Sequence, residues 1–117
     1  MLGVFNGFYK CEEIIVDVVQ LNPLAYGLEG SCIWFEVSIT INGNDIALSD
    51  FHFYLADSNK KIINPSLMYD SSNYVKTKND IGVFVGFEFS PDFFYNIPVF
   101  CFYCDTYKRV ELIELVC

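Results

Sequence analysis

An alternation of side chains over two long stretches constrains this chain more than any other feature. In Cys32–Ile41 one alternating set is entirely apolar, namely Ile33, Phe35, Val37, Ile39 and Ile41. Residues 81–89 repeat the pattern with Ile81, Val83, Val85, Phe87 and Phe89. Successive side chains of a β-strand point to opposite faces of its sheet, so a period of two indicates half-buried strands. We expect both apolar sets to face the core. Gly82 and Gly86, in the other set, predict a close ring or backbone on the outer face.

Shorter segments of the same kind extend the all-β pattern along the chain. Strands or extended segments are expected at residues 4–9, 12–21, 46–48, 51–56, 61–65, 74–76, 99–104 and 109–116, with a loose stretch at 66–80. Because no window has a sustained helical period with caps, an α/β layout is disfavoured. About seven to eight short strands with frequent turns predict a sandwich or barrel. At 117 residues, the chain fits one domain, 1–117.

The charge of the chain limits its partners. Seven Lys and Arg against 15 Asp and Glu give a net charge of -8. Phosphate backbones and anionic lipids repel such a protein at long range, so we expect no nucleic-acid partner. A basic or Ca²⁺-bearing partner is compatible with this charge, although surplus carboxylates also simply keep a Phe-rich domain soluble.

Targeting signals are missing from the sequence as it stands. Its first residues lack the basic start and apolar stretch of a signal peptide. The most apolar segments, 14–19 and 93–104, are shorter than the roughly 20 residues that a membrane helix needs. We expect no membrane insertion, with a cytoplasmic location for the chain as given or an extracellular one if a leader has been removed.

The five cysteines indicate a reducing compartment, because an odd number leaves at least one thiol unpaired. Cys101 and Cys104 form a C-x-x-C motif, but it falls in an expected strand. Three steps of about 3.3 Å place the two Cα atoms about 10 Å apart, with the side chains on opposite faces, which is too far for a disulfide. We expect buried apolar thiols in preference to a redox or metal site.

No catalytic constellation stands out. His52, the single histidine, is expected to point to solvent between Phe51 and Phe53, so the sequence predicts no catalytic residues and no enzyme. The carboxylates of Glu12 and Glu13, or of Glu111 and Glu114, diverge on strands. Oxygen ligands for calcium could gather in loops, but turn formation explains the same residues, so we expect no cofactor and no metal. The residues in question are Asp45, Asp50, Asp57 and Asn59.

Aromatic residues on the expected outer faces are the candidate binding residues. Trp34, Tyr54 and Phe84 fall on these faces, and Phe93 and Phe94 fall in an expected loop. A contiguous exposed apolar area marks a partner site. The alternative is that the segment 66–80 or a second subunit covers these faces.

The order of features resembles the immunoglobulin-like, telokin-like domains of Gram-positive bacterial surface lipoproteins. The resemblance lies in Phe35–Gly43, in Asp50–Lys61 and in Gly86–Pro91, and it extends over about residues 12–116. It implies an immunoglobulin-like antiparallel β-sandwich of about seven to eight strands. Such a domain is expected to mediate protein–protein association, with a partner or as a homodimer. The alternative function is a small-ligand or carbohydrate-binding sandwich.

Overall fold

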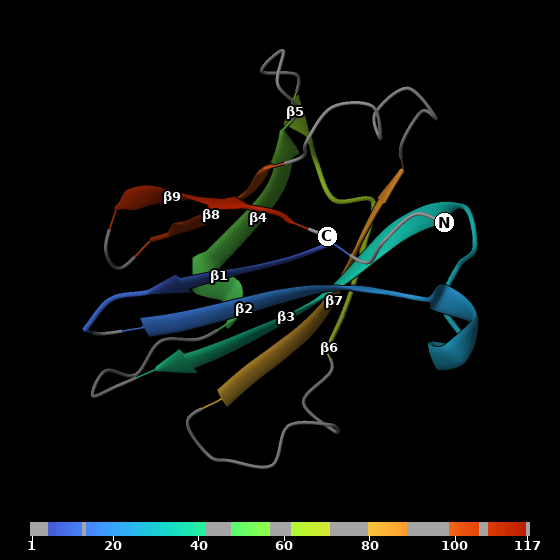
Figure 1. Ribbon diagram of the computed structural model, residues 1–117, viewed down its shortest axis with the longest axis horizontal. Coiled ribbons are helices and arrows are strands. Elements are labelled where there is room, and N and C mark those ends of the chain that lie inside the picture. The colour runs from blue at the N-terminus through green and yellow to red at the C-terminus, as the bar shows by residue number, and fades with distance from the viewer. Residues whose placement is uncertain are drawn as a thin grey trace.

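The alternating segments form the strands of two antiparallel sheets that pack face to face, as the computed structural model shows (Figure 1). The structure describes residues 5–12, 14–41, 48–56, 62–70, 80–88, 99–105 and 108–116. Within them, the first sheet has the strand order β1-β2-β3-β7-β6 and the second has the order β5-β4-β8-β9. The predicted all-β antiparallel sandwich is confirmed.

The strands of each sheet come from distant parts of the chain. The first sheet contains β1 (Asn6–Lys10), β2 (Ile14–Leu21), β3 (Cys32–Ile41), β6 (Leu67–Asp70) and β7 (Asp80–Glu88). The second contains β4 (Phe51–Ala56), β5 (Ile62–Ile63), β8 (Val99–Cys104) and β9 (Arg109–Glu114). Two short 3-10 helices are η1 (Pro23–Tyr26) and η2 (Leu48–Asp50). Among the described residues, no helix has the length and apolarity to cross a membrane.

The strand order is that of an immunoglobulin-like sandwich. The series β2-β3-β7-β6 corresponds to the A-B-E-D sheet of such domains, and β4-β8-β9 corresponds to C-F-G, with β5 in the place of C′. The additional strand β1 pairs with the outer side of β2. The described residues therefore hold nine strands, where the sequence predicted seven or eight.

Strand β6 lies in the segment that the sequence predicted to be loose. It pairs with β7 along one side, with Met68 opposite Val85 and Tyr69 opposite Phe84. Three large apolar residues in a row, Leu67 to Tyr69, give no period of two, and the strand is only four residues long. The alternation test cannot detect a strand of this kind. The brief strand expected at 74–76 lies outside the described residues.

The core lies between the two sheets and is built from the predicted apolar sets. On β3, Phe35 is opposite Val85 of β7, and Val37 is opposite Val83. The second sheet contributes Phe100, whose ring centroid lies 5.8 Å from that of Phe35. All five predicted core residues of β3 are buried, as are Val83, Val85 and Phe87. The predicted direction of these side chains is confirmed, whereas Phe89 lies outside the described residues.

One lateral edge of the sandwich is closed by a bridge between its first and last described segments. The backbone N–H of Asn6 donates to the Val116 carbonyl at 2.8 Å, and that of Val116 donates to the Asn6 carbonyl at 2.9 Å. Gly7 faces the second sheet here, and a Cβ at this position would collide with Ile113. The close approach of β1 to β9 therefore requires glycine at position 7.

Candidate functional site

Trp34, the first predicted binding residue, lies on the outer face of the first sheet but is 0% exposed. Its ring stacks on Tyr69 with the centroids 5.7 Å apart. Its indole N–H donates to the Glu29 carbonyl at 2.7 Å, so the buried polar group is satisfied. A Cβ at Gly86 would lie only 2.8 Å from the ring. The neighbouring ring that the sequence predicted at this glycine is therefore Trp34.

Phe84 shares this second, smaller core and is 5% exposed. The Tyr26 ring covers it with the centroids 5.4 Å apart. The cluster contains Cys32, Trp34 and Phe84, with Leu21, Leu28 and Leu67 packed against it. The prediction that Trp34 and Phe84 form an exposed aromatic surface is wrong. Strand β6, which lies in the segment 66–80 that the sequence offered as a cover, packs over Trp34. The segment after β2, which the sequence did not offer as a cover, packs over Phe84.

The covering segment is shaped by local turn chemistry. Asn22 caps η1 by accepting a hydrogen bond from the Leu24 N–H at 3.1 Å. Gly27 then adopts a left-handed conformation with φ of 67°, which favours glycine. The chain thereby turns back, so that Tyr26 and Leu28 reach the outer face of the sheet.

Of the three remaining predicted binding residues, the structure describes Tyr54. Tyr54 is half-buried on the outer face of the second sheet, whereas its neighbours on β4, Phe53 and Leu55, are buried in the core. Phe93 and Phe94 lie outside the described residues. Tyr54 is thus the only one of the five predicted residues that the described structure shows to be accessible.

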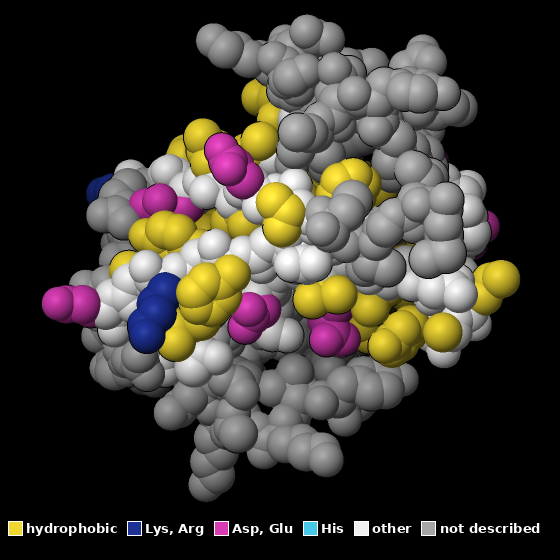
Figure 2. Space-filling model, in the orientation of Figure 1, with side chains coloured by type: hydrophobic (Ala, Val, Ile, Leu, Met, Phe, Trp, Pro, Cys, Tyr) yellow, Lys and Arg dark blue, Asp and Glu magenta, His cyan; other side chains and the backbone are white. Residues whose placement is uncertain are grey.

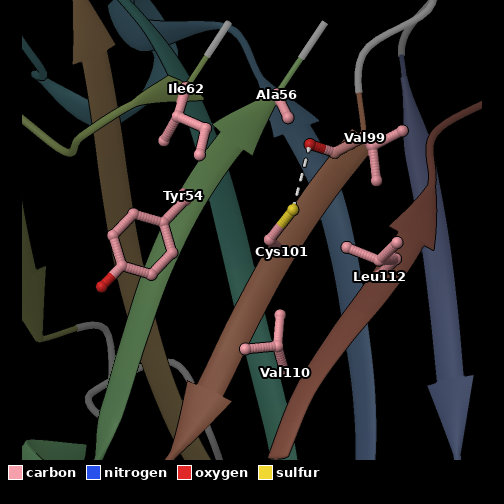
Figure 3. A pocket seen from close by; sticks show the side chains of 7 residues that line it. All are labelled: Tyr54, Ala56, Ile62, Val99, Cys101, Val110 and Leu112. Carbon is pink, nitrogen blue, oxygen red and sulfur yellow. Dashed lines mark hydrogen bonds between the residues drawn. The ribbon is translucent and has the colours of Figure 1, made fainter. Parts of the chain in front are cut away.

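Tyr54 lines a hydrophobic groove with a volume of about 530 Å³ (Figure 3). We call this outer surface of the second sheet the groove face, and its residues are Tyr54, Ala56, Ile62, Val99, Cys101, Val110 and Leu112. None of these side chains carries a formal charge when Cys101 and Tyr54 are protonated. Sequence reasoning did not identify this apolar recess.

The groove has a simple cause in side-chain size. Along β8 and at the end of β4, Ala56, Val99 and Cys101 form its floor, two of them small (Figure 3). Side chains on the neighbouring strands form two walls, Tyr54 and Ile62 on one side and Val110 and Leu112 on the other. Since neighbouring strands are about 4.8 Å apart, walls on either side of β8 stand about 10 Å apart.

The aliphatic wall residues are largely in solvent. Ile62 and Leu112 are each 65% exposed, and Val110 is 61% exposed. On β9, Ile113 and Leu115 face the core instead. Both alternating sets of this strand are therefore rich in apolar residues, so the sequence pattern cannot tell which set is buried. This ambiguity is why sequence reasoning missed Val110 and Leu112.

Cys101 lies at the centre of the floor. It is paired with Tyr54 on one side and with Leu112 on the other. Its Sγ lies 4.0 Å from the Val99 carbonyl oxygen, and burial raises the pKa of its thiol above the ordinary value. A thiol held protonated is a weak nucleophile. Cys104, three residues along β8, packs in the main core, so the predicted divergence of the C-x-x-C pair is confirmed. The four described cysteines, Cys11 among them, form no disulfide.

His52 lies next to the groove face, at its β4 end. The ring is exposed, as predicted, and its Nε2 is 3.2 Å from a carboxylate oxygen of Asp105. The residue paired with His52 on β8 is Tyr103, whereas Cys101 is paired with Tyr54. The histidine therefore pairs with a carboxylate just beyond the end of β8.

Charged groups do not converge on a metal site in the described part of the chain, where no cluster of three His, Cys, Asp or Glu side chains occurs. Of the loop residues considered for calcium, Asp50 is described, whereas Asp45, Asp57 and Asn59 lie outside the described residues. Glu111 and Glu114 are three residues apart on β9 and so project to opposite faces. In the view of Figure 2, hydrophobic side chains alternate with scattered Asp and Glu, and basic side chains are few.

One solved structure resembles this fold. It is the crystal structure of a DUF4426 family protein from Pseudomonas aeruginosa PAO1, with 14% sequence identity and a TM-score of 0.51. The likeness covers 93% of this chain and 89% of that one. At this identity it shows the fold alone. No protein-family model and no curated protein matches the chain. The similarity to telokin-like domains stays a prediction.

Proposed function

We propose that the protein is a non-catalytic binding module that associates with another protein through the groove face. The observation that carries this proposal is the exposure of the two aliphatic walls, with Ile62 and Leu112 each 65% exposed. Soluble monomers rarely expose contiguous apolar areas beyond a few hundred Å², and such areas mark interaction sites.

The contrast between the two sheets supports this assignment. The outer face of the first sheet has its own apolar cluster, but Leu28, Leu67 and Tyr69 cover it from within the chain. The groove face has a comparable run of apolar residues and leaves its walls open. Its aliphatic residues therefore gain burial only from something outside the described structure.

The free energy available from covering the walls is useful for binding. Complete burial of a Val, Leu or Ile side chain is worth about 1.5–3 kcal/mol. Ile62, Val110 and Leu112 each have about 60–65% of their surface still to bury. Covering them therefore gives about 1–2 kcal/mol each, or about 3–6 kcal/mol together.

The chemistry of the polar groups favours binding over catalysis. The Cys101 thiol is kept protonated by a pKa that burial raises, which weakens it as a nucleophile. The His52 ring pairs with Asp105 and offers no paired base to the thiol. A nucleophile needs an adjacent base or a lowered pKa for activation, and Cys101 has the opposite pKa shift.

A small apolar ligand is the second candidate, favoured by the groove volume of about 530 Å³. Ligand sites of about 300–1,000 Å³ with apolar linings are typical of proteins. A carbohydrate fits less well, because sugars need several polar partners and the lining side chains offer only the Tyr54 hydroxyl and the Cys101 thiol.

Site-specific photo-crosslinking tests the proposed function. A photoreactive benzoylphenylalanine replaces Leu112 in the chain expressed in its native cells, and the same residue replaces Phe8 as the control. Phe8 is 58% exposed but lies on β1, away from the groove face. We expect a discrete protein adduct from position 112 and none from position 8. Absence of any protein adduct at position 112 would overturn the proposal, and an adduct with a small molecule would support the second candidate.

A further inference from the structure

We propose that the partner of the groove face is a basic, proline-rich segment of another protein, bound in the extended polyproline II conformation. This inference rests on the proposed function and deepens it by naming the chemistry of the partner. Three properties of the groove support it: its width, the backbone geometry of its floor and the charge around its ends.

The width of the groove favours an extended chain over a helix. Tyr54 of β4 and Leu112 of β9 flank Cys101 on β8 (Figure 3). The two walls therefore stand two strand spacings, or about 10 Å, apart. The space between them is narrower than this, because the wall side chains have their own thickness. An α-helix with its side chains is about 10–12 Å wide, so it would rest on the walls without reaching the floor. A single extended chain fits between the walls.

The floor of the groove favours the polyproline II conformation among extended ones. The backbone N–H and C=O groups of a strand point along the sheet toward its neighbours, and β8 is paired with a strand on each side. A segment lying over β8 therefore gains no strand pairing, which requires a free sheet edge. A polyproline II helix has no internal hydrogen bonds and keeps its backbone solvated, so it needs no such pairing.

Proline suits the side chains that this face presents. Proline-rich segments dock in grooves lined by aromatic and apolar side chains, and they lose little conformational freedom because their conformation is already formed. Tyr54 supplies an aromatic ring at one wall. Tyr103, two residues beyond Cys101 on β8, faces the same side of the sheet and is half-buried. Its ring centroid lies 6.1 Å from that of His52, so a second aromatic surface continues the path along β8.

The charge around the groove favours basic residues on either side of the prolines. Glu114 is opposite Val99 near one end of β8, and Asp105, which pairs with His52, follows the other end. Both carboxylates belong to exposed residues. Lys108, in the turn between β8 and β9, partly offsets this charge, but the whole chain carries a net charge of -8. Its field therefore attracts a segment that carries Lys or Arg.

The length of the floor sets the length of the segment. From Val99 to Tyr103 the floor extends over four steps of about 3.4 Å, or about 14 Å. A polyproline II helix rises by about 3.1 Å per residue, so about five residues cover the floor. An interface this small is typical of weak, transient contacts, so we expect a dissociation constant on the order of 100 μM.

Titration of the isotopically labelled chain with three synthetic peptides, followed by two-dimensional NMR, tests this inference. The first peptide is Lys-Pro-Pro-Leu-Pro-Pro-Lys, blocked at both ends. The second has Glu in place of both Lys, and the third has Gly and Ser in place of the prolines. We expect the first peptide to shift the amide signals of β4, β8 and β9, and to bind about threefold or more weakly in high salt. Each control peptide should bind about tenfold or more weakly than the first.

A pair of variants locates the peptide on the groove face. Leu112→Ser removes part of one wall without a change in charge and should weaken binding of the first peptide by about fivefold or more. Phe8→Ser makes the same kind of change at a residue of β1 that is 58% exposed, and it should leave the affinity unchanged. Fluorescence of Trp34, which is buried on the opposite sheet, reports whether each variant remains folded.

The two proposals fail separately. The inference is overturned if the first peptide does not bind, if either control peptide binds as tightly, or if Leu112→Ser leaves its affinity unchanged. If position 112 still crosslinks to a protein in cells after such a result, the proposed function stands with a partner of different chemistry. If the first peptide binds as expected but position 112 gives no protein adduct in cells, the proposed function alone fails.

Discussion

Replacement of Gly86 by Ala should destabilise the protein, because the Trp34 ring occupies the space that a methyl group needs. The added Cβ would lie 2.8 Å from Cη2 and 2.9 Å from Cζ2 and Cζ3 of that ring. Carbon atoms pack best at about 3.5–4.0 Å, so the ring must move by about 0.6–1.2 Å. Its N–H is held by the Glu29 carbonyl at 2.7 Å, and one ring face stacks on Tyr69. The ring therefore has little freedom to move.

The expected magnitude follows from two opposing terms. Overpacking of a close-packed site costs about 1–3 kcal/mol. Ala recovers about 0.5–1 kcal/mol over Gly within a strand, because it loses less backbone freedom on folding. The two ranges leave a net destabilisation of about 0–2.5 kcal/mol, with a mid-range value of about 1.2 kcal/mol. With an m-value of about 1.5 kcal/mol/M, this mid-range value lowers the midpoint of urea unfolding by about 0.8 M.

The matched control is the same substitution in a Trp34→Phe background, with unfolding followed by far-ultraviolet circular dichroism in all variants. Phe lacks the outer ring atoms that approach Gly86, so Gly86→Ala should there be neutral or stabilising. If Gly86→Ala in the wild-type background leaves the midpoint of urea unfolding unchanged or raises it, the Trp34 ring does not pack over Gly86 as described.

Three further predictions concern the core, the thiol of Cys101 and the groove residue Leu112. The Phe35 ring contacts those of Phe87 and Phe100, so Phe35→Ala should lower the free energy of unfolding by about 3–5 kcal/mol. A loss below about 1 kcal/mol in urea titrations would place the ring outside the core. Because burial raises the pKa of Cys101, the rate of its alkylation by iodoacetamide should be low at neutral pH and should still increase above pH 9.0. An alkylation rate that reaches its plateau below pH 9.0 would contradict this expectation. The stabilising effect of this buried protonated thiol is present at neutral pH and is lost as the pH rises above the unfolded-state value. Leu112→Ser should change the free energy of unfolding by no more than about 0.5 kcal/mol while weakening association, and an unfolded variant would show that Leu112 is a core residue.

The sequence predicted the inner faces of the sandwich because burial there follows directly from the period of the strands. Phe35 and Val85 lie where the alternation places them. The strands alone predicted a sandwich or barrel, and the immunoglobulin-like order was expected only from the family resemblance. Alternation also separated Cys101 from Cys104 and placed His52 in solvent. These properties depend on one strand and its pleat, which neighbouring residues specify.

The outer faces could not be predicted in the same way. Alternation places Trp34 away from the main core, but its burial depends on Leu28 and Tyr69, which come from segments without a period. The groove depends on the combination of a small residue, Cys101, with longer residues on two neighbouring strands. That combination is set by strand pairing, and β9 offers two apolar sets between which the pattern does not choose.

A comparison of photo-crosslinking yields from the two walls of the groove shows whether the groove face is the binding surface. Benzoylphenylalanine is placed in turn at position 62, at position 112 and at position 8, so that two probes sit on opposite walls and one lies on the other sheet. We expect adducts of the same mass from positions 62 and 112 and none from position 8. An equal yield at position 8, or no adduct from either wall, would show that the groove face is not the binding surface.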